Sequence, residues 1–145
     1  IKIRFSHLAN VLMPGWVDWP KIVLPSKYAT FGLAPYHPTE DFNQSIPNKV
    51  IDYFSFGLPV VSALSGEVRR LIDSRRVGIN YDPADIIVFF ATIEAICGDR
   101  NNLNDMSTKV VELYEERFKG EVVYESLCRT LEQLKSSHEV DAKTS

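Results

Sequence analysis

Residues 31–63, FGLAPYHPTEDFNQSIPNKVIDYFSFGLPVVSA, decide the fold. Two short apolar runs, Phe31–Pro35 and Val60–Ala63, flank a segment with helical spacing that starts at Pro47 and runs up to Gly57. Proline suits the first turn of a helix, and glycine suits the residue after the last turn. Short strands that are apolar throughout are typical of parallel sheets covered by helices. The stretch therefore predicts a strand–helix–strand unit of a parallel sheet.

The same alternation continues on both sides of this unit. Upstream, Val11–Met13 is a strand candidate, and Asp18 followed by Trp19-Pro20 marks a helix start. Downstream, we expect a short helix at Glu67–Ser74 and a short strand at Gly78–Tyr81. The chain thus alternates strands and helices over most of its first half.

Three apolar stripes at helical spacing predict three further helices. The first follows Asp82-Pro83-Ala84-Asp85, which resembles an N-cap with an acidic residue at the third helical position. The last stripe is expected to be core. The stripes are Ile86, Ile87, Phe90, Ile93 and Cys97; then Leu103, Met106, Val110, Leu113 and Tyr114; then Val123, Leu127, Leu131 and Leu134.

Together these elements predict an α/β fold with a Rossmann-like parallel sheet and helices on both faces. We expect about four strands, whereas a complete domain of this kind has about six. Because the chain starts in the middle of the pattern, we expect its first β-α-β unit to be missing. Residues 1–135 should form this partial domain, and residues 136–145 a frayed polar tail.

Composition suits one globular domain and excludes some partners. The 145 residues are 45% hydrophobic and 24% charged, with a net charge of −3. That balance gives no electrostatic reason to expect a nucleic-acid partner. Two cysteines, Cys97 and Cys128, favour a reducing, cytoplasmic setting, although one bridge between them stays open. No apolar run reaches the roughly 20 residues that span a bilayer.

Several common catalytic and cofactor patterns are missing from the sequence. No glycine pattern fits a dinucleotide fingerprint or a phosphate loop, and no nucleophile elbow is present. His7, His37 and His138 lie far apart and lack zinc-ligand spacing. No two aspartates stand two residues apart, so an Asp-x-Asp metal site is missing too. We therefore expect neither a cofactor nor a metal.

The loop before Pro47 is a candidate anion site. Ligands of open α/β sheets bind beyond the carboxyl ends of strands, and the amides and dipole of a helix N-terminus favour phosphate there. Ser45 and Ile46 supply amides, and Asn48 adds a side-chain donor. Asp52 lies one to two turns further, on another face of the helix than the residues that can face the sheet, and it can accept hydrogen bonds from ribose hydroxyls. On these residues alone, a solvated aspartate beside a plain loop is the favoured interpretation.

A longer match favours the binding-site interpretation instead. The segment PNKVIDYFSFGLPVV, residues 47–61, resembles the signature helix of the retaining GT-B glycosyltransferases of the large family four. Gly57, Pro59, Val60 and Val61 match the end of that signature. Weaker matches at MPGWVDW, SALSGE, VGINYDPAD and EERF extend the resemblance over roughly Val11 to Leu134. The resemblance implies the C-terminal, donor-binding half of a GT-B fold, truncated at its N-terminus.

The resemblance also assigns roles to residues. Asp52 stands where the family holds the nucleotide ribose, and Gln44 stands where a glutamate touches the transferred sugar. Gln44 is thus the candidate catalytic residue, although glutamine carries no charge. The remaining positions implied to bind the donor are Ser45, Ile46 and Pro47 at the pyrophosphate and sugar, with Asn48 beside them, and Gly15, Trp16 and Val17 around the base.

By the same resemblance, the intact enzyme would transfer a hexose from a nucleotide diphosphate sugar to a saccharide or lipid-linked acceptor. Configuration would be retained without a metal, in a pathway that builds surface polysaccharides. The missing N-terminal domain would hold the acceptor, and the last helix would pack back towards it, so this chain alone should be inactive. We expect it in the cytoplasm, with peripheral attachment to the inner membrane face left open. A non-catalytic nucleotide-sugar-binding module and a GT-B sugar-nucleotide epimerase remain alternatives, although the histidines are poorly placed for epimerisation.

Two further groups of side chains have more ordinary explanations. Arg69, Arg70, Arg75 and Arg76 form a basic cluster that could contact a phosphate, but a solvated helix face is the favoured interpretation. The indoles of residues 16 and 19 could stack on a base or pack in the core, and the sequence favours neither.

Overall fold

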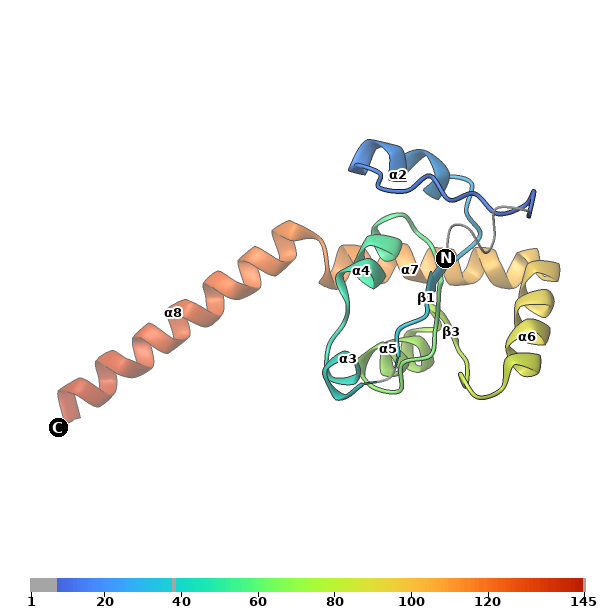
Figure 1. Ribbon diagram of the computed structural model, residues 1–145. Helices are drawn as coiled ribbons and strands as arrows, with labels where there is room; N and C mark the ends of the chain where they lie inside the picture. Colours follow the sequence, from blue (N-terminus) through green and yellow to red (C-terminus); the bar gives the residue numbers. More distant parts are fainter. Residues whose placement is uncertain (1–7, 38, 145) are drawn as a thin grey trace.

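The computed structural model describes residues 8–37 and 39–144, with side chains described up to Lys135. The described chain is a mixed α/β fold with a small open parallel sheet, compatible with a Rossmann-like arrangement (Figure 1). Its elements are α2 (Trp19–Ser26), β1 (Gly32–Ala34), α3 (Glu40–Gln44), α4 (Asn48–Ser55), β2 (Val60–Ser62), α5 (Glu67–Arg75), β3 (Gly78–Asn80), α6 (Ile86–Gly98), α7 (Arg100–Arg117) and α8 (Gly120–Thr144).

The three strands lie in chain order, and both pairs are parallel. Gly32, Val60 and Gly78 lie side by side across the sheet, as do the residues that follow them on each strand. All three residues of the central strand β2 are buried. The predicted parallel sheet is therefore confirmed, and β2 is its centre.

Glycines allow α4 to lie close to the sheet. A methyl group at Gly32 would overlap the ring of Tyr53, which lies on α4. The hydroxyl of Tyr53 donates a hydrogen bond to the carbonyl of Leu33 at 3.0 Å. Burial raises the pKa of that hydroxyl, and the neighbouring Tyr36 and Asp52 raise it further. Tyr53 thus fixes α4 to β1 at a distance that a larger side chain on the strand would not permit.

The main core lies between one face of the sheet and helices α4, α5 and α7. On the opposite face, Leu33 and Ile79 flank the buried Val61, yet Leu33 is 40% exposed and Ile79 is partly exposed. Helices on both faces were expected, but the second face of the described sheet is only partly covered. The core residues are Ala34, Val50, Phe54, Val60, Leu64, Val68, Leu71, Ile72, Val77, Val110 and Leu113.

Most predicted boundaries between residues 18 and 81 are confirmed. Asp18 is the N-cap residue of α2, and Pro47 is that of α4. Gly57 ends α4 with a φ of +69°, a conformation that favours glycine. The strands and α5 match their predicted positions to within about one residue at most ends.

Two predictions near the ends of this region are wrong. Val11–Met13 is not a strand, so the described chain has three strands instead of about four. The helix after β3 is capped by Asp85, whose carboxylate accepts the amide of Val88 at 2.9 Å. Asp82 instead accepts the amide of Ala84 within the preceding turn. The acidic pair was recognised, but the N-cap is its second member and lies three residues later than predicted.

The three apolar stripes differ in their burial. Val110 and Leu113 of α7 are buried, as predicted. On α6 only Ile96 is buried, and Ile86, Ile87 and Phe90 are exposed. The predicted core stripe of α8 is wrong in this chain, because that helix leads away from the rest of the fold (Figure 1) and its leucines are exposed. The α8 helix also continues through Thr144, over most of the segment expected to be a frayed tail.

Within residues 8–37 and 39–144, no helix combines the length and the apolar character needed to cross a bilayer.

Phe54 provides a test of the core. Its side chain is 1% exposed, whereas that of Phe90 is 59% exposed. Phe54→Ala should lower the free energy of unfolding by about 3–5 kcal/mol, because the substitution leaves a cavity between α4 and the sheet. Phe90→Ala removes the same ring from the surface and should change it by less than about 1 kcal/mol. Urea unfolding followed by circular dichroism measures both; equal losses would contradict this core.

Candidate functional site

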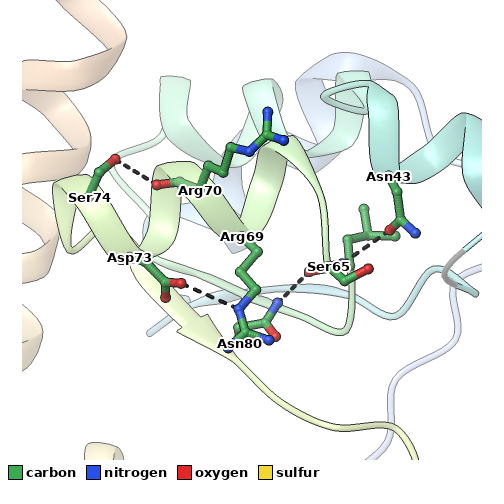
Figure 2. Close-up of polar contacts among 8 residues, drawn as sticks. Asn43, Ser65, Arg69, Arg70, Asp73, Ser74 and Asn80 are labelled. Carbon is green, nitrogen blue, oxygen red and sulfur yellow. Dashed lines mark hydrogen bonds and ion pairs between the residues drawn. The ribbon is translucent and has the colours of Figure 1, made fainter.

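The loop between β2 and α5, residues 63–66, is fixed by hydrogen bonds to side chains at the ends of β2 and β3. The buried hydroxyl of Ser62 accepts the amide of Leu64 at 3.2 Å. The side-chain amide of Asn80, the last residue of β3, donates to the carbonyl of Leu64 at 2.6 Å. Figure 2 shows Asn80 and Ser65 at this edge. The carboxyl ends of β2 and β3 therefore share one rigid loop.

Asn43 joins the loop after β1 to the same edge. Its carboxamide oxygen, on α3, accepts the backbone amide of Ser65 at 3.1 Å (Figure 2). A methyl group at Gly66 would overlap the backbone carbonyl of Asn43. Only glycine permits this approach without movement of one backbone segment. The loops after β1 and β2 are consequently in contact at the edge where ligands of α/β sheets bind.

A pocket of about 470 Å³ opens at this edge. Arg69 reaches it from the first turns of α5, and its Nε lies 3.3 Å from a carboxylate oxygen of Asp73. The pocket mixes a guanidinium, a hydroxyl, an amide and a carboxylate, which suits a polar ligand better than an apolar one. It is lined by Ala63, Ser65, Arg69, Asn80, Tyr81, Asp82 and Pro83.

Sequence reasoning missed this pocket, because its lining comes from segments separated along the chain. The available signal was the position of Ser65 a few residues beyond one apolar strand and of Asn80 at the end of the next. The arginines predicted as a cluster behave mainly as an ordinary helix surface. Arg70 pairs with Glu67 in the same helix, and Arg75 pairs with Glu116 of α7.

The N-terminus of α4 is the predicted phosphate end. Pro47 accepts the amide of Val50 at 2.8 Å, and no side chain caps the helix. Its first turn contains no acidic residue, and the ammonium of Lys49 lies 5.7 Å from the centre of the Tyr36 ring. The helix dipole at this end is therefore not offset by a local carboxylate, and Lys49 adds positive charge to it.

The residues just before α4 are largely occupied by local contacts. Ser45 is extended, and its hydroxyl donates to the carbonyl of Asp41 at 2.8 Å. Ile46 is half-buried and packs against the core. Gln44 is exposed at the end of α3, where its amide donates to Glu40 at 3.1 Å. The hydrogen bond to Glu40 uses one of the two N–H groups of the Gln44 amide, so the second can still donate to a ligand.

Asp52 lies on the exposed side of α4. Val50 and Phe54 are buried, whereas Asn48, Lys49 and Asp52 are all exposed. Residues three and four apart are neighbours on a helix surface, so these three polar side chains form one face that leads away from the helix start. The expected placement of Asp52 away from the sheet is confirmed.

The structure does not bring the predicted base loop to this helix start. Gly15 has a φ of +85°, and Trp16 is 98% exposed. Val17 lines an apolar pocket of about 300 Å³ beside Tyr53. Trp19 stacks on Phe56, with ring centres 5.3 Å apart. This segment thus lies against the C-terminal half of α4, whereas Ser45–Pro47 precede its other end, about 12 Å along the axis.

Other candidate chemistry is dispersed. His37 is exposed, His7 lies outside the described residues, and the side chain of His138 is not described. Cys97 and Cys128 are both free and exposed. The described residues contain no cluster of three or more histidine, cysteine or acidic side chains that could hold a metal ion.

Gly66 tests the contact between the two loops. Gly66→Ala should lower the free energy of unfolding by about 1–3 kcal/mol, because its methyl group forces a backbone shift at Asn43. Gly98→Ala is the matched control, since a methyl group there meets no atom within 4 Å. Thermal unfolding of the two variants should differ clearly. A Gly66→Ala protein as stable as Gly98→Ala would show that the loops are not in this contact.

No protein-family model matches the sequence, and comparisons with curated proteins and with solved structures found no match either.

Proposed function

We propose that this chain is the donor-binding domain of a retaining glycosyltransferase and binds a nucleotide diphosphate sugar. One observation carries the proposal: the uncapped N-terminus of α4 follows the carboxyl end of β1, and Asn48, Lys49 and Asp52 line the exposed face that leads away from it. Phosphate and ribose are adjacent groups in a nucleotide. A helix start followed within roughly 6 Å by a carboxylate suits that pair.

The sheet supports the same proposal. In one half of a doubly wound sheet, consecutive strands lie side by side in chain order, and ligands bind beyond their carboxyl ends. The strands β1, β2 and β3 follow that order. The loops after β1 and β2 are locked together at this edge by Asn43 and Gly66. Their rigidity would limit the loss of entropy when a ligand binds.

Each polar residue then has a defined task. Free amides of the first turn of α4, together with Lys49, hold the diphosphate by charge-assisted hydrogen bonds. Asp52 accepts hydrogen bonds from ribose hydroxyls, and the amide of Gln44 donates to a hydroxyl of the hexose. In the longer enzyme, the same helix start stabilises the negative charge that develops on the departing diphosphate. A separate domain of the intact enzyme would hold the acceptor.

A non-catalytic nucleotide-sugar-binding module is the second candidate. The observation that favours it is the hydrogen bond between Gln44 and Glu40 within α3. An uncharged side chain already engaged by its own helix is a weak catalytic group. The apolar loop around Val17 gives less support to either candidate, because it lies at the far end of α4 from the proposed diphosphate position.

Asp52→Ala tests the ribose contact. Loss of a charged hydrogen bond costs about 1.5–3 kcal/mol, so the affinity for uridine or guanosine diphosphate should fall roughly 10- to 150-fold. Glu125→Ala, which removes an exposed carboxylate from α8, should leave the affinity unchanged. Ligand-observed NMR measures both on this chain. Binding that is insensitive to Asp52→Ala, or no binding by the wild type, would refute the proposal.

Gln44→Ala separates the sugar from the nucleotide. We expect a loss of about 0.5–1.5 kcal/mol in affinity for a nucleotide diphosphate hexose and no change for the free diphosphate, because only the hexose meets this side chain. Competition NMR with both ligands gives the comparison. An equal loss for both ligands would place Gln44 elsewhere. In the same samples we expect no sugar transfer, and measurable transfer would contradict the need for a separate acceptor domain.

A further inference from the structure

The pocket at the carboxyl edge of β2 and β3 has no task in the proposed nucleotide site. Its volume of about 470 Å³ lies within the range of roughly 300–1,000 Å³ that is usual for small-molecule sites. Its walls come from the loop after β2, from α5 and from the segment after β3, whereas the proposed diphosphate position lies at the start of α4. The pocket is therefore a candidate for a second ligand, and its lining indicates the chemistry of that ligand.

Arg69 presents its guanidinium to the pocket in a fixed orientation. Its Nε lies 3.3 Å from a carboxylate oxygen of Asp73, one turn further along α5. A guanidinium has five N–H donors, so this pair leaves the terminal nitrogens able to donate to a ligand. Figure 2 shows Arg69 directed towards Asn80, whereas the neighbouring Arg70 is directed away from it. Arg69 thus supplies donors whose direction is set before a ligand binds.

The segment after β3 adds hydrogen-bond acceptors. One carboxylate oxygen of Asp82 accepts the amide of Ala84 at 2.9 Å, which leaves the second oxygen for a ligand. Asn80 uses one N–H for the carbonyl of Leu64 at 2.6 Å, which leaves its second N–H and its own oxygen. Both side chains are therefore held by backbone groups and keep atoms that can bind a ligand.

Tyr81 supplies an aromatic surface between these two polar residues. Its backbone amide donates to the carbonyl of Ser62 at 3.0 Å, which fixes it at the end of β3. Its ring packs against Phe89 of α6, with ring centres 4.5 Å apart, and remains partly exposed at the pocket. A ring in this position offers apolar area on which the C–H face of a sugar ring can pack.

The charges around the pocket argue against phosphate as its ligand. Arg69 is already paired with Asp73, and Asp82 adds a further carboxylate to the wall. At the start of α5, Glu67 and Arg70 pair with each other, and Glu67 opposes an anion at that helix end. Carboxylates thus outnumber guanidinium groups here, so the pocket has no excess of positive charge with which to hold an anion.

We propose that this pocket binds a neutral pyranose unit of a saccharide. Each sugar hydroxyl can both donate and accept a hydrogen bond, so neighbouring hydroxyls need donors and acceptors close together. Arg69 and Asn80 supply donors, Asp82 and Asn80 supply acceptors, and Tyr81 supplies an apolar surface for the ring. Because the protein already holds these side chains, binding costs little of their conformational entropy. The site needs no nucleotide, and so it goes beyond the proposed function.

Saturation-transfer NMR on this chain tests the site with the methyl glycosides of glucose, galactose and mannose at millimolar concentration. At least one of them should receive saturation at its ring protons. Arg69→Ala should lower the affinity for that glycoside about tenfold or more, because a charged donor is lost. Arg70→Ala makes the same change one residue along α5, outside the pocket, and should leave the affinity unchanged.

Asp82→Asn is a second variant that preserves the local fold. It keeps an oxygen for the amide of Ala84 but replaces the second oxygen with a donor, so the affinity should again fall about tenfold. Circular dichroism should show wild-type secondary structure for both pocket variants. A wild-type chain that binds none of the glycosides would overturn the proposal. An affinity unchanged by either Arg69→Ala or Asp82→Asn would overturn it too.

Competition identifies where the sugar comes from. Uridine and guanosine diphosphates should not displace the glycoside, because their proposed contacts lie at α4. Displacement by a nucleotide diphosphate hexose would assign the pocket to the hexose of the donor, and persistence of the glycoside would assign it to a separate saccharide. Displacement by inorganic phosphate or by the free diphosphates would reveal an anion site and refute the proposal. Asp52→Ala should leave glycoside binding unchanged, so this inference and the proposed function can fail separately.

Discussion

The fold depends on a row of small side chains across the sheet. Gly32, Val60 and Gly78 lie side by side on the three strands, so the central valine has a glycine on each side. The Tyr53 ring occupies the space above Gly32, and a side chain at Gly78 would overlap the backbone of Val60. Because the strands are only three residues each, the sheet gains little from its own hydrogen bonds. The sheet is therefore stabilised mainly by the helices that pack on it, and α4 packs closely on β1 because residue 32 has no side chain.

The candidate site follows from the same close packing. Once α4 is fixed to β1 by Tyr53, the loop that precedes it must return across the carboxyl edge of the sheet. There it meets the loop after β2 at Asn43 and Gly66. One contact is a hydrogen bond from the Ser65 amide to the Asn43 side chain, and the other is close backbone packing at Gly66, so α3, which precedes α4, is fixed to the loop after β2. Rigid placement of this kind is what a phosphate-binding helix end requires.

The sequence predicted the centre of the molecule better than its surroundings. Apolar runs punctuated by glycine and proline located β1, α4 and β2, because local chemistry determines where such elements begin and end. Val11–Met13 has the same apolar character but no neighbouring strand in the described chain. Strand formation needs a partner, and a short apolar run does not say whether one is present.

Periodicity located α6, α7 and α8 but could not decide which stripes are buried. Val110 and Leu113 are buried in the core, whereas Leu127 and Leu131, which also follow helical spacing, are exposed. Periodicity identifies a face, and burial depends on what packs against it. For the site, sequence placed Asp52 on the exposed side of α4. It could not show that Gly15–Val17 lie near the far end of α4, because that depends on tertiary packing. The hydrogen bond from Gln44 to Glu40 is local, but it requires the short helix α3, where we expected a loop.

Polar and apolar exposed surfaces are separated in this chain. The carboxyl edge gathers Asn43, Ser65 and Asn80 into hydrogen bonds and leaves a polar pocket. The exposed apolar stripe lies on α8, which leads away from the sheet (Figure 1). The candidate ligand site and the exposed apolar stripe therefore lie on different elements of the chain.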